Sequence, residues 1–276
     1  MIRKRFGQHF LEPAWVDKVV RAIAPLADET FIEIGPGRGA LTRSLAARAK
    51  TVAAFEIDRD LAAELSATAP PNLTVIQGDF LEVEATGARL LPKDSRLPAP
   101  DRIRVAGNLP YNIASPILFK LVEFFVLGVP LVDATVMLQR EVADRLTAAP
   151  GSRQYGVLSI LIRRYARADV MLKLPPGAFR PPPAVNSALV RLRFHAPVPQ
   201  VQDAATFAGL VQAVFTRRRK TLANALLAYK GRPPASSPAE TLAAADLDGR
   251  RRPETLSIME FGRLADAYAG KGRAVL

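Results

Sequence analysis

Short apolar runs alternate with helical patterns along the first two-thirds of the chain, and this alternation restricts the fold more than any other feature. The runs expected to form strands cover residues 31–34, 51–57, 73–76, 103–106 and 134–138, with later strands at 170–174 and 188–194. Strands that alternate with helices predict right-handed crossovers and a parallel sheet. Ligands of such sheets bind at the carboxyl ends of the strands. We therefore expect an α/β fold with a binding site along one edge of its sheet.

Glycine and acidic residues follow the first three of these runs. The turn Gly35-Pro36-Gly37-Arg38-Gly39 has the spacing G-x-G-x-G, which differs from the G-x-G-x-x-G of dinucleotide enzymes. Glu56 is placed to accept hydrogen bonds from both hydroxyls of a ribose. Asp79 could accept from an adenine amine between apolar walls made by Ile57 and Phe80. No phosphate-binding lysine follows the glycines, so the pattern predicts a nucleoside without phosphates. The alternatives are a ligand-free turn and carboxylates that lie on the surface or cap helices.

The four residues Asn108-Leu109-Pro110-Tyr111 come after the apolar run 103–106. The Asn108 side-chain oxygen and the Leu109 carbonyl can each accept one N–H of an exocyclic amine. Pro110 fixes the backbone, and Tyr111 offers a ring on which a base can stack. Two acceptors favour a pyramidal nitrogen with an available lone pair, so a nucleoside pocket beside this turn predicts S-adenosylmethionine and methyl transfer. The alternative is an ordinary strand-to-helix turn with a core aromatic.

The composition excludes several other classes. The chain has no cysteine and only two histidines, His9 and His195, so disulfides and thiolate sites are excluded and no metal is expected. No apolar run approaches the roughly 18 residues of a membrane span. The basic N-terminus lacks the apolar core of a signal peptide. These features together predict a cytoplasmic protein without a membrane partner.

The positive charge is concentrated in the last third of the chain. The net charge is +12, and residues 186–276 hold 14 Lys and Arg against 7 Asp and Glu. The run Arg217, Arg218, Arg219 and Lys220 lies in an amphipathic stretch, and a second run occupies 250–252. A cationic helix face of this kind predicts contact with the phosphates of a polyanionic partner. A merely solvated cationic helix is the alternative.

Motifs spread over nearly the whole chain resemble those of the ribosomal RNA adenine N6,N6-dimethyltransferases, and specifically the branch that modifies the small subunit. The matching segments are 5–11, 33–39, 56–58, 78–81, 108–112, 139–143, 155–159, 179–187 and 218–226. Segment 179–187 carries the pattern F-x-P-x-P-x-V-x-S, which is highly specific in combination with the N-terminal and Asn-Leu-Pro-Tyr motifs.

The resemblance implies a class I S-adenosylmethionine-dependent methyltransferase, with a Rossmann-like seven-stranded sheet whose last strand is antiparallel. It implies a cofactor-binding domain at 1–195 and a small, basic, α-helical domain that binds rRNA at 196–276. The implied reaction is the dimethylation of two adjacent adenines near the 3′ end of 16S rRNA, in an immature small ribosomal subunit. The implied cofactor contacts are His9, Leu11, Gly35, Glu56, Asp79 and Asn108. Many members of the family have Asn where this chain has His9, which matters only if the side chain makes the contact.

In the expected mechanism the adenine leaves its RNA stack and enters the pocket. Tyr111 stacks on one face and Phe179 on the other, although Phe179 could instead belong to the core. No metal is required, and no convincing general base is present. The rivals are the large-subunit (23S) rRNA methyltransferase of the macrolide-resistance type, a mitochondrial transcription-factor relative, an assembly factor and a nicotinamide oxidoreductase. A monomer is the default expectation.

Overall fold

A computed structural model describes residues 9–85, 101–231 and 237–270. Motif residues 5–8 and most of the loops expected at 85–101 and 231–238 lie outside the described residues. The contacts divide the chain into two units. The first contains the described residues up to 143 together with 167–194, and the second contains 144–166 and the described residues from 195 onward.

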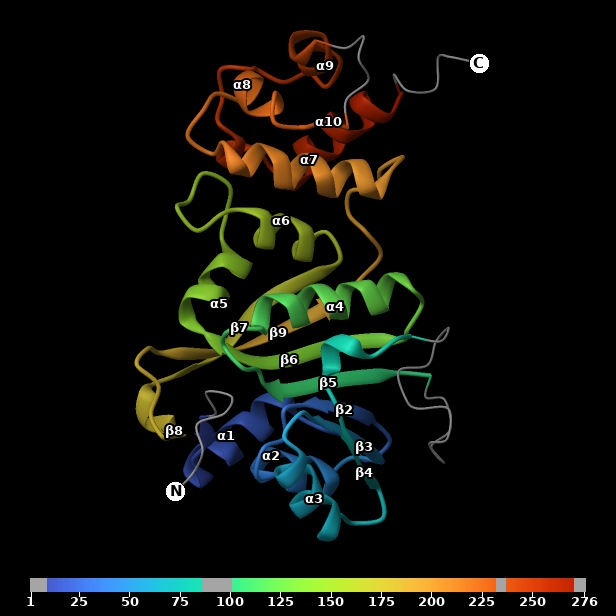
Figure 1. Ribbon diagram of the computed structural model, residues 1–276, viewed down its shortest axis with the longest axis vertical. Helices are drawn as coiled ribbons and strands as arrows, with labels where there is room; N and C mark the ends of the chain where they lie inside the picture. Colours follow the sequence, from blue (N-terminus) through green and yellow to red (C-terminus); the bar gives the residue numbers. More distant parts are fainter. Residues whose placement is uncertain (1–8, 86–100, 232–236, 271–276) are drawn as a thin grey trace. The chain divides into compact units, whose positions relative to one another are not determined.

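The first unit is built on a seven-stranded sheet (Figure 1). Its strands, in spatial order, are β4 (Leu73–Gln77), β3 (Thr51–Glu56), β2 (Thr30–Ile34), β5 (Ile103–Asn108), β6 (Leu131–Gln139), β9 (Ser187–Phe194) and β7 (Ala166–Leu174). The pairs from β4 to β6 are all parallel, and β9 is antiparallel to β6. This arrangement confirms the predicted fold class, including the antiparallel late strand.

Helices cover both faces of this sheet. The helices α1 (Pro13–Ile23), α2 (Ala40–Ala46) and α3 (Arg59–Ala67) lie on one side, and α4 (Ala114–Val126) lies on the other (Figure 1). The first three bury the apolar side chains Val19, Ile23, Leu45 and Leu65 against the sheet. A parallel sheet is covered on both faces, and β2 accordingly has only its first residue, Thr30, outside the buried class.

A two-stranded sheet not foreseen from the sequence joins the N-terminus to a distant loop. Strand β1 (Phe10–Leu11) pairs with β8 (Phe179–Arg180) in antiparallel register, with Leu11 opposite Phe179. Two-residue strands carry too little periodicity to be recognised in a sequence. The ion pair between Arg180 and Glu12, at 2.7 Å, adds a second link between the same segments. The N-terminal segment is therefore held against the loop that contains the F-x-P-x-P motif.

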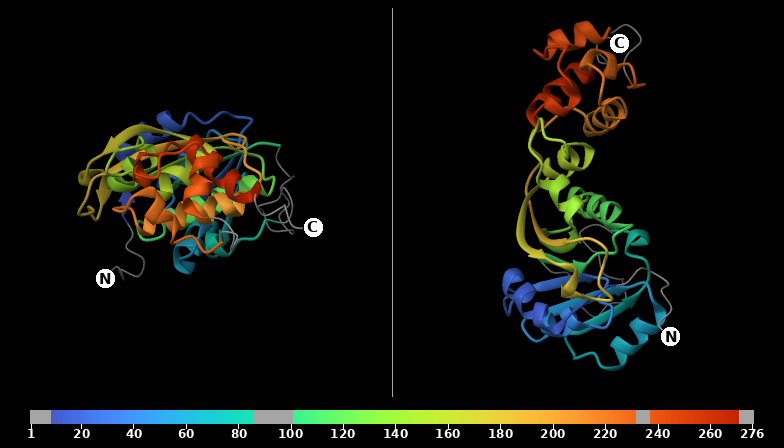
Figure 2. Two further views of the ribbon diagram at one scale, coloured as in Figure 1. Left: turned by 90° about the horizontal axis from the view of Figure 1, so that it is seen from above. Right: turned by 90° about the vertical axis from the view of Figure 1, so that its left-hand side faces the viewer.

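The second unit is a helical bundle around its own core. It contains α6 (Val157–Arg163), α7 (Ala204–Thr216), α8 (Leu222–Leu226), α9 (Pro238–Ala244) and α10 (Ile258–Gly270), while α5 (Arg140–Thr147) crosses the boundary between the units. Helices α7 and α10 pack against each other (Figure 2). None of the helices in the described residues is long and apolar enough to cross a membrane.

Residues 144–166 require a correction to the sequence-based boundary, which assigns them to the first domain. Ala148, Tyr155 and Ile160 are buried in the same cluster as Phe207 and Leu210 of α7. These residues complete the apolar core of the second unit. The boundary near residue 196 is based on the composition of the linker, which carries no information about which residues are in contact.

Candidate active site

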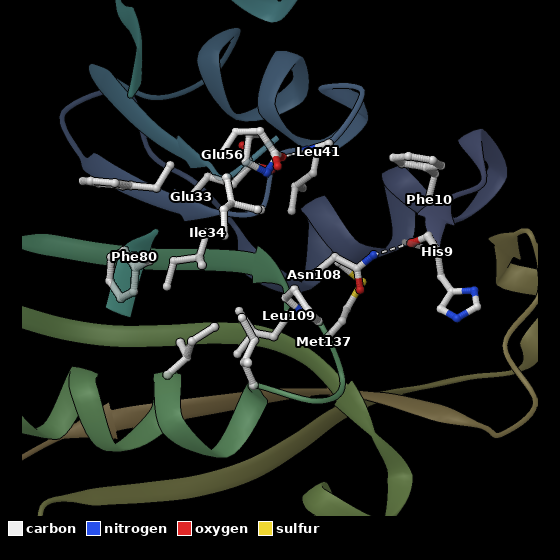
Figure 3. A pocket seen from close by; sticks show the side chains of 18 of the residues that line it. His9, Phe10, Glu33, Ile34, Leu41, Glu56, Phe80, Asn108, Leu109 and Met137 are labelled. Atoms are coloured by element: carbon white, nitrogen blue, oxygen red, sulfur yellow. Dashed lines mark hydrogen bonds between the residues drawn. The ribbon is translucent and has the colours of Figure 1, made fainter. Parts of the chain in front are cut away.

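A pocket lies at the carboxyl ends of the strands at the middle of the sheet (Figure 3). The residues predicted from the sequence that line it are His9, Leu11, Gly35, Glu56, Ile57, Asp79, Phe80, Asn108, Leu109, Pro110 and Tyr111. Apart from His9 and Leu11, which belong to the β1 segment, they come together because β2, β3, β4 and β5 run parallel, so that the residues at their carboxyl ends share one edge of the sheet.

The glycine turn after β2 brings the backbone close to this edge. Gly35 and Gly37 have φ angles of +69° and +56°, which residues with a Cβ rarely adopt. A Cβ on Gly37 would lie 2.9 Å from the ring of Phe10. The glycines therefore allow β1 to close over the turn and form one wall of the pocket.

Glu56 ends β3 with its carboxylate buried at the pocket wall. The side chain is only 3% exposed, so this is not a surface carboxylate. Its oxygens accept hydrogen bonds from the backbone N–H of Gly37 at 2.8 Å and of Asp58 at 3.0 Å. Burial raises the pKa of Glu56, and these two N–H donors oppose the rise. Each carboxylate oxygen has further acceptor capacity, so the group is able to accept from a diol.

Asp79 follows β4 and faces the same pocket. One of its oxygens accepts from the Leu81 N–H at 2.9 Å and caps the short 3₁₀ helix Phe80–Glu82. The buried Phe80 ring makes edge contacts with Phe55 and Phe124. Ile57 is 38% exposed and forms the outer apolar wall. The three residues predicted to surround an adenine ring thus line one pocket.

Asn108 is the last residue of β5, which extends two residues beyond the run 103–106 expected from the sequence. Its Nδ2 donates a hydrogen bond to the backbone carbonyl of His9 at 2.6 Å. Its Oδ1 accepts none from the described residues, and the same holds for the carbonyl of Leu109. The Leu109 N–H donates to the Met137 carbonyl at 3.2 Å, which continues the β5–β6 ladder into the turn. Two acceptors are therefore free at the turn.

Tyr111 is half-buried beside these acceptors. Its hydroxyl forms a hydrogen bond of 2.7 Å with the Ser187 hydroxyl at the start of β9. The His9 imidazole stacks on its ring, with 5.5 Å between centroids. Burial raises the pKa of Tyr111. The ring is thus fixed at both its face and its hydroxyl.

Phe179 does not line the pocket in this structure. The side chain is 1% exposed and belongs to the hydrophobic core with Leu11, Leu174 and Ala178. This is the alternative role considered for Phe179 from the sequence. Its stacking on a substrate base stays a prediction, which requires the 179–187 loop to move.

The chain matches known proteins over almost its full length. The model of the family described as ribosomal RNA adenine dimethylase matches residues 1–262. The chain belongs to this family. The ribosomal RNA small subunit methyltransferase A of Xanthomonas euvesicatoria is 41% identical over 268 residues, covering 96% of this chain and 95% of the relative. The protein of the same name from Acidithiobacillus ferrooxidans is 40% identical over 275 residues, which cover 98% of this chain and 96% of the relative.

Two solved structures resemble this member of the dimethylase family. A dimethyladenosine transferase from Plasmodium falciparum has a TM-score of 0.75 and 26% identity, covering 96% of this chain and 98% of its own. The 23S rRNA methyltransferase ErmE has a TM-score of 0.64 and 26% identity, covering 94% and 99%. The identity to the small-subunit enzymes is thus higher than the identity to ErmE.

The pocket of this dimethylase fits S-adenosylmethionine, the methyl donor of the family. Glu33, which is 1% exposed, has a buried Oε2 with no hydrogen-bond partner among the described residues, as has the hydroxyl of Thr42. An ammonium group such as that of the methionine moiety would satisfy Glu33. The exposed Arg38 guanidinium lies 4.7 Å from the centre of the Phe10 ring. Arg38 is the one Lys or Arg among the described residues that line the pocket, and it could pair with the carboxylate of the methionine moiety. Sequence reasoning noticed the turn but assigned no role to Glu33 or Arg38.

The basic run of the dimethylase lies in the second unit and is not uniform. Arg218 is paired with Glu254 at 2.9 Å and donates to the Ser152 carbonyl at 3.1 Å. Arg217, Arg219 and Lys220 are exposed and line a surface hollow together with Asn224. In the described part of the chain, neither Arg219 nor Lys220 has an acidic partner, so these two cations are available to a phosphate.

Proposed function

We propose that this protein dimethylates N6 of two adjacent adenines near the 3′ end of 16S rRNA, in the assembling small ribosomal subunit, with S-adenosylmethionine as methyl donor. The membership in the dimethylase family and the relatives named as small subunit methyltransferases support this proposal. We expect a monomer that acts in the cytoplasm, where the subunit would be its partner. We further propose that Glu56 holds the ribose of the cofactor, Asp79 its adenine, and Glu33 and Arg38 its methionine moiety.

The observation that carries the proposal is the orientation of Asn108. Because Nδ2 is engaged by the His9 carbonyl, Oδ1 and the Leu109 carbonyl are the two groups left to accept N–H bonds from an adenine amine. An aromatic amine is a weak nucleophile because its lone pair is delocalised into the ring. Two acceptors bound to its two hydrogens favour a pyramidal nitrogen whose lone pair is available. A pair of hydrogen-bond donors at this position would instead make the lone pair of the nitrogen less available.

When bound, S-adenosylmethionine supplies an electrophilic methyl group on a positively charged sulfur. The protein contributes alignment and electrostatics. Tyr111 holds the base by stacking, and the two acceptors hold N6. The proton released by the amine passes to solvent. For the second transfer one N–H remains, so one of the two acceptors must give way to the first methyl group.

A second candidate is the 23S rRNA methyltransferase activity of the kind named for ErmE. The higher identity to the small-subunit enzymes and the Arg-Arg-Lys-Thr-Leu sequence at 218–222 argue against it. A role in subunit assembly that depends more on binding than on catalysis is compatible with the same site. Restoration of subunit maturation by a catalytically inactive variant would favour that role.

The direct test is methyl transfer from labelled S-adenosylmethionine to small subunits that lack these modifications, with large subunits in parallel and nucleoside analysis of both. We expect N6,N6-dimethyladenosine in the small subunit alone. Label in large-subunit RNA would instead assign the protein to the 23S type, and tight binding without label would indicate an assembly factor.

The Asn108→Ala variant tests the site itself. It removes one of the two acceptors, so the single-turnover rate should fall at least a hundredfold, which corresponds to about 2.7 kcal/mol of barrier. The affinity for S-adenosylmethionine should change much less. Asn112→Ala, an exposed amide in the same turn, is the matched control. Near-normal single-turnover methylation by Asn108→Ala would refute the role proposed for the amide.

A further inference from the structure

His9 makes three contacts that converge on the proposed catalytic turn. Its backbone carbonyl accepts the hydrogen bond from Asn108 Nδ2 at 2.6 Å. Its imidazole Nδ1 lies 2.7 Å from the Pro181 carbonyl oxygen. Its ring covers one face of Tyr111. Figure 3 shows the carbonyl directed at Asn108 and the imidazole turned away from it. One residue thus links the N-terminus, the 179–187 loop and the turn after β5.

The hydrogen bond to the His9 carbonyl decides which end of the Asn108 amide faces the substrate. A carbonyl oxygen can only accept, so the NH₂ end of the amide must point toward His9. The oxygen is then left for N6. If the amide rotated by half a turn, its NH₂ group would meet the NH₂ group of adenine, and two donors cannot bond to each other. The activity proposed above therefore requires a carbonyl held at this place.

The side chain of His9 has two contacts of its own beside that carbonyl. The β1–β8 ladder begins at Phe10, so residue 9 lies outside its paired residues. Since the Pro181 carbonyl can only accept, Nδ1 carries a proton and donates to it. This bond joins residues 172 positions apart in the sequence. The stacked Tyr111 ring restrains the imidazole from a second direction.

We propose that His9 is a positioning residue, whose imidazole is fixed by Pro181 and Tyr111 so that its backbone carbonyl orients the Asn108 amide for N6 recognition. The proposal rests on the function proposed above. In this proposal, residue 9 contributes to catalysis through its backbone carbonyl. Its side chain contributes by keeping that carbonyl in place.

The chemistry of the contact identifies the variants that test it. Nδ1 of His and Nδ2 of Asn are both bonded to Cγ, so His9→Asn can keep a donor at the position that faces Pro181. His9→Leu has similar bulk but no donor, and His9→Ala lacks both. Arg180→Gln is the matched control, because it breaks the ion pair between β8 and Glu12, the residue after β1, and replaces neither His9 nor Asn108.

The measurement is the single-turnover rate of methylation of unmodified small subunits at saturating S-adenosylmethionine. We expect about a tenfold loss for His9→Ala and His9→Leu, and a rate within about threefold of the wild type for His9→Asn and Arg180→Gln. In the Asn108→Ala background the His9→Ala change should have no further effect, because the amide that it positions is absent.

A general structural role for His9 would give a different pattern. Equal losses in the His9→Asn and His9→Ala variants would overturn the proposal, as would an undiminished effect of His9→Ala in the Asn108→Ala background. A wild-type protein that methylates no rRNA adenine would refute the proposed function itself. Full activity of His9→Ala beside an active wild type would refute only the role of His9.

Discussion

At the scale of single residues, the buried Glu33 is the group whose ionisation bears most directly on the pocket. Burial, opposed by the Thr42 hydroxyl and assisted by the nearby Glu56 carboxylate, raises its pKa from 4.5 to about 8. The carboxyl group therefore keeps its proton near neutral pH, when the pocket holds no cation. An ammonium group beside it would favour the charged form instead. Cofactor binding and the protonation of Glu33 are thus expected to be linked.

The Glu33→Gln variant checks this linkage. The folded state holds a proton that the unfolded chain releases near pH 4.5, so Glu33 lowers the free energy of unfolding progressively as the pH rises from 4.5 toward 8. The variant lacks this dependence, so without cofactor it should be more stable than the wild type at pH 8. Its affinity for S-adenosylmethionine should fall about tenfold, the loss of one charge-assisted hydrogen bond.

Thermal unfolding at pH 6 and pH 8, with and without S-adenosylmethionine, measures both effects. Glu64→Gln, which makes the same substitution at an exposed position of α3, serves as the control. An unchanged cofactor affinity in Glu33→Gln would show that the methionine moiety does not reach this carboxyl group.

At the scale of secondary-structure elements, the start of α10 shows how local sequence and a distant side chain combine. Ser257 and Glu260 form a capping box, with the Ser257 hydroxyl accepting from the Glu260 N–H at 3.2 Å and the Glu260 carboxylate accepting from the Ser257 N–H at 2.7 Å. Arg251 pairs with the same carboxylate. The hydrogen bond from Arg251 lowers the pKa of Glu260 to about 2.

Glu260→Gln should destabilise the protein by about 1–2 kcal/mol at pH 7, after allowance for partial exposure of the pair. Since the folded-state pKa is below the unfolded one, this contribution is present above pH 4.5 and is lost as the pH falls toward 2. Urea unfolding at pH 7 and pH 3 measures the difference, which should shrink at the lower pH. Glu64→Gln, at an exposed position of α3, is the control. Equal differences at both pH values would contradict the assignment.

At the scale of the whole molecule, the structure divides the positive charge of the last third into paired and unpaired cations. Arg250 and Arg251 pair with Asp248 and Glu260, and Arg218 pairs with Glu254. The pairs reduce the charge that these arginines present to a phosphate. In the described residues the exposed Arg219 and Lys220 lack such partners, so the proposed RNA contact is assigned to them first.

The double variant Arg219→Gln/Lys220→Gln should weaken binding to small subunits and reduce the slope of log affinity against log salt by roughly 1.4–1.8, since each lost phosphate contact contributes about 0.7–0.9. Arg250→Gln, which removes a paired cation, should leave the slope nearly unchanged. Filter binding between 50 and 300 mM salt provides the measurement. A slope that is identical in the double variant and the wild type would exclude these two residues from phosphate contact.

The sequence by itself determined the features that depend on neighbouring residues. Alternating apolar runs predicted the parallel sheet, and the residues at the ends of these runs predicted the pocket, because parallel strands bring their carboxyl ends to one edge. Only the tertiary structure decided that the His9 carbonyl meets Asn108, that Phe179 is packed in the core, and that residues 144–166 complete the core of the second unit. It also decided that Arg218 is paired with Glu254, whereas Arg219 has no acidic partner among the described residues. These features join segments far apart in the chain, and their contacts follow from packing and strand register, which no local pattern encodes.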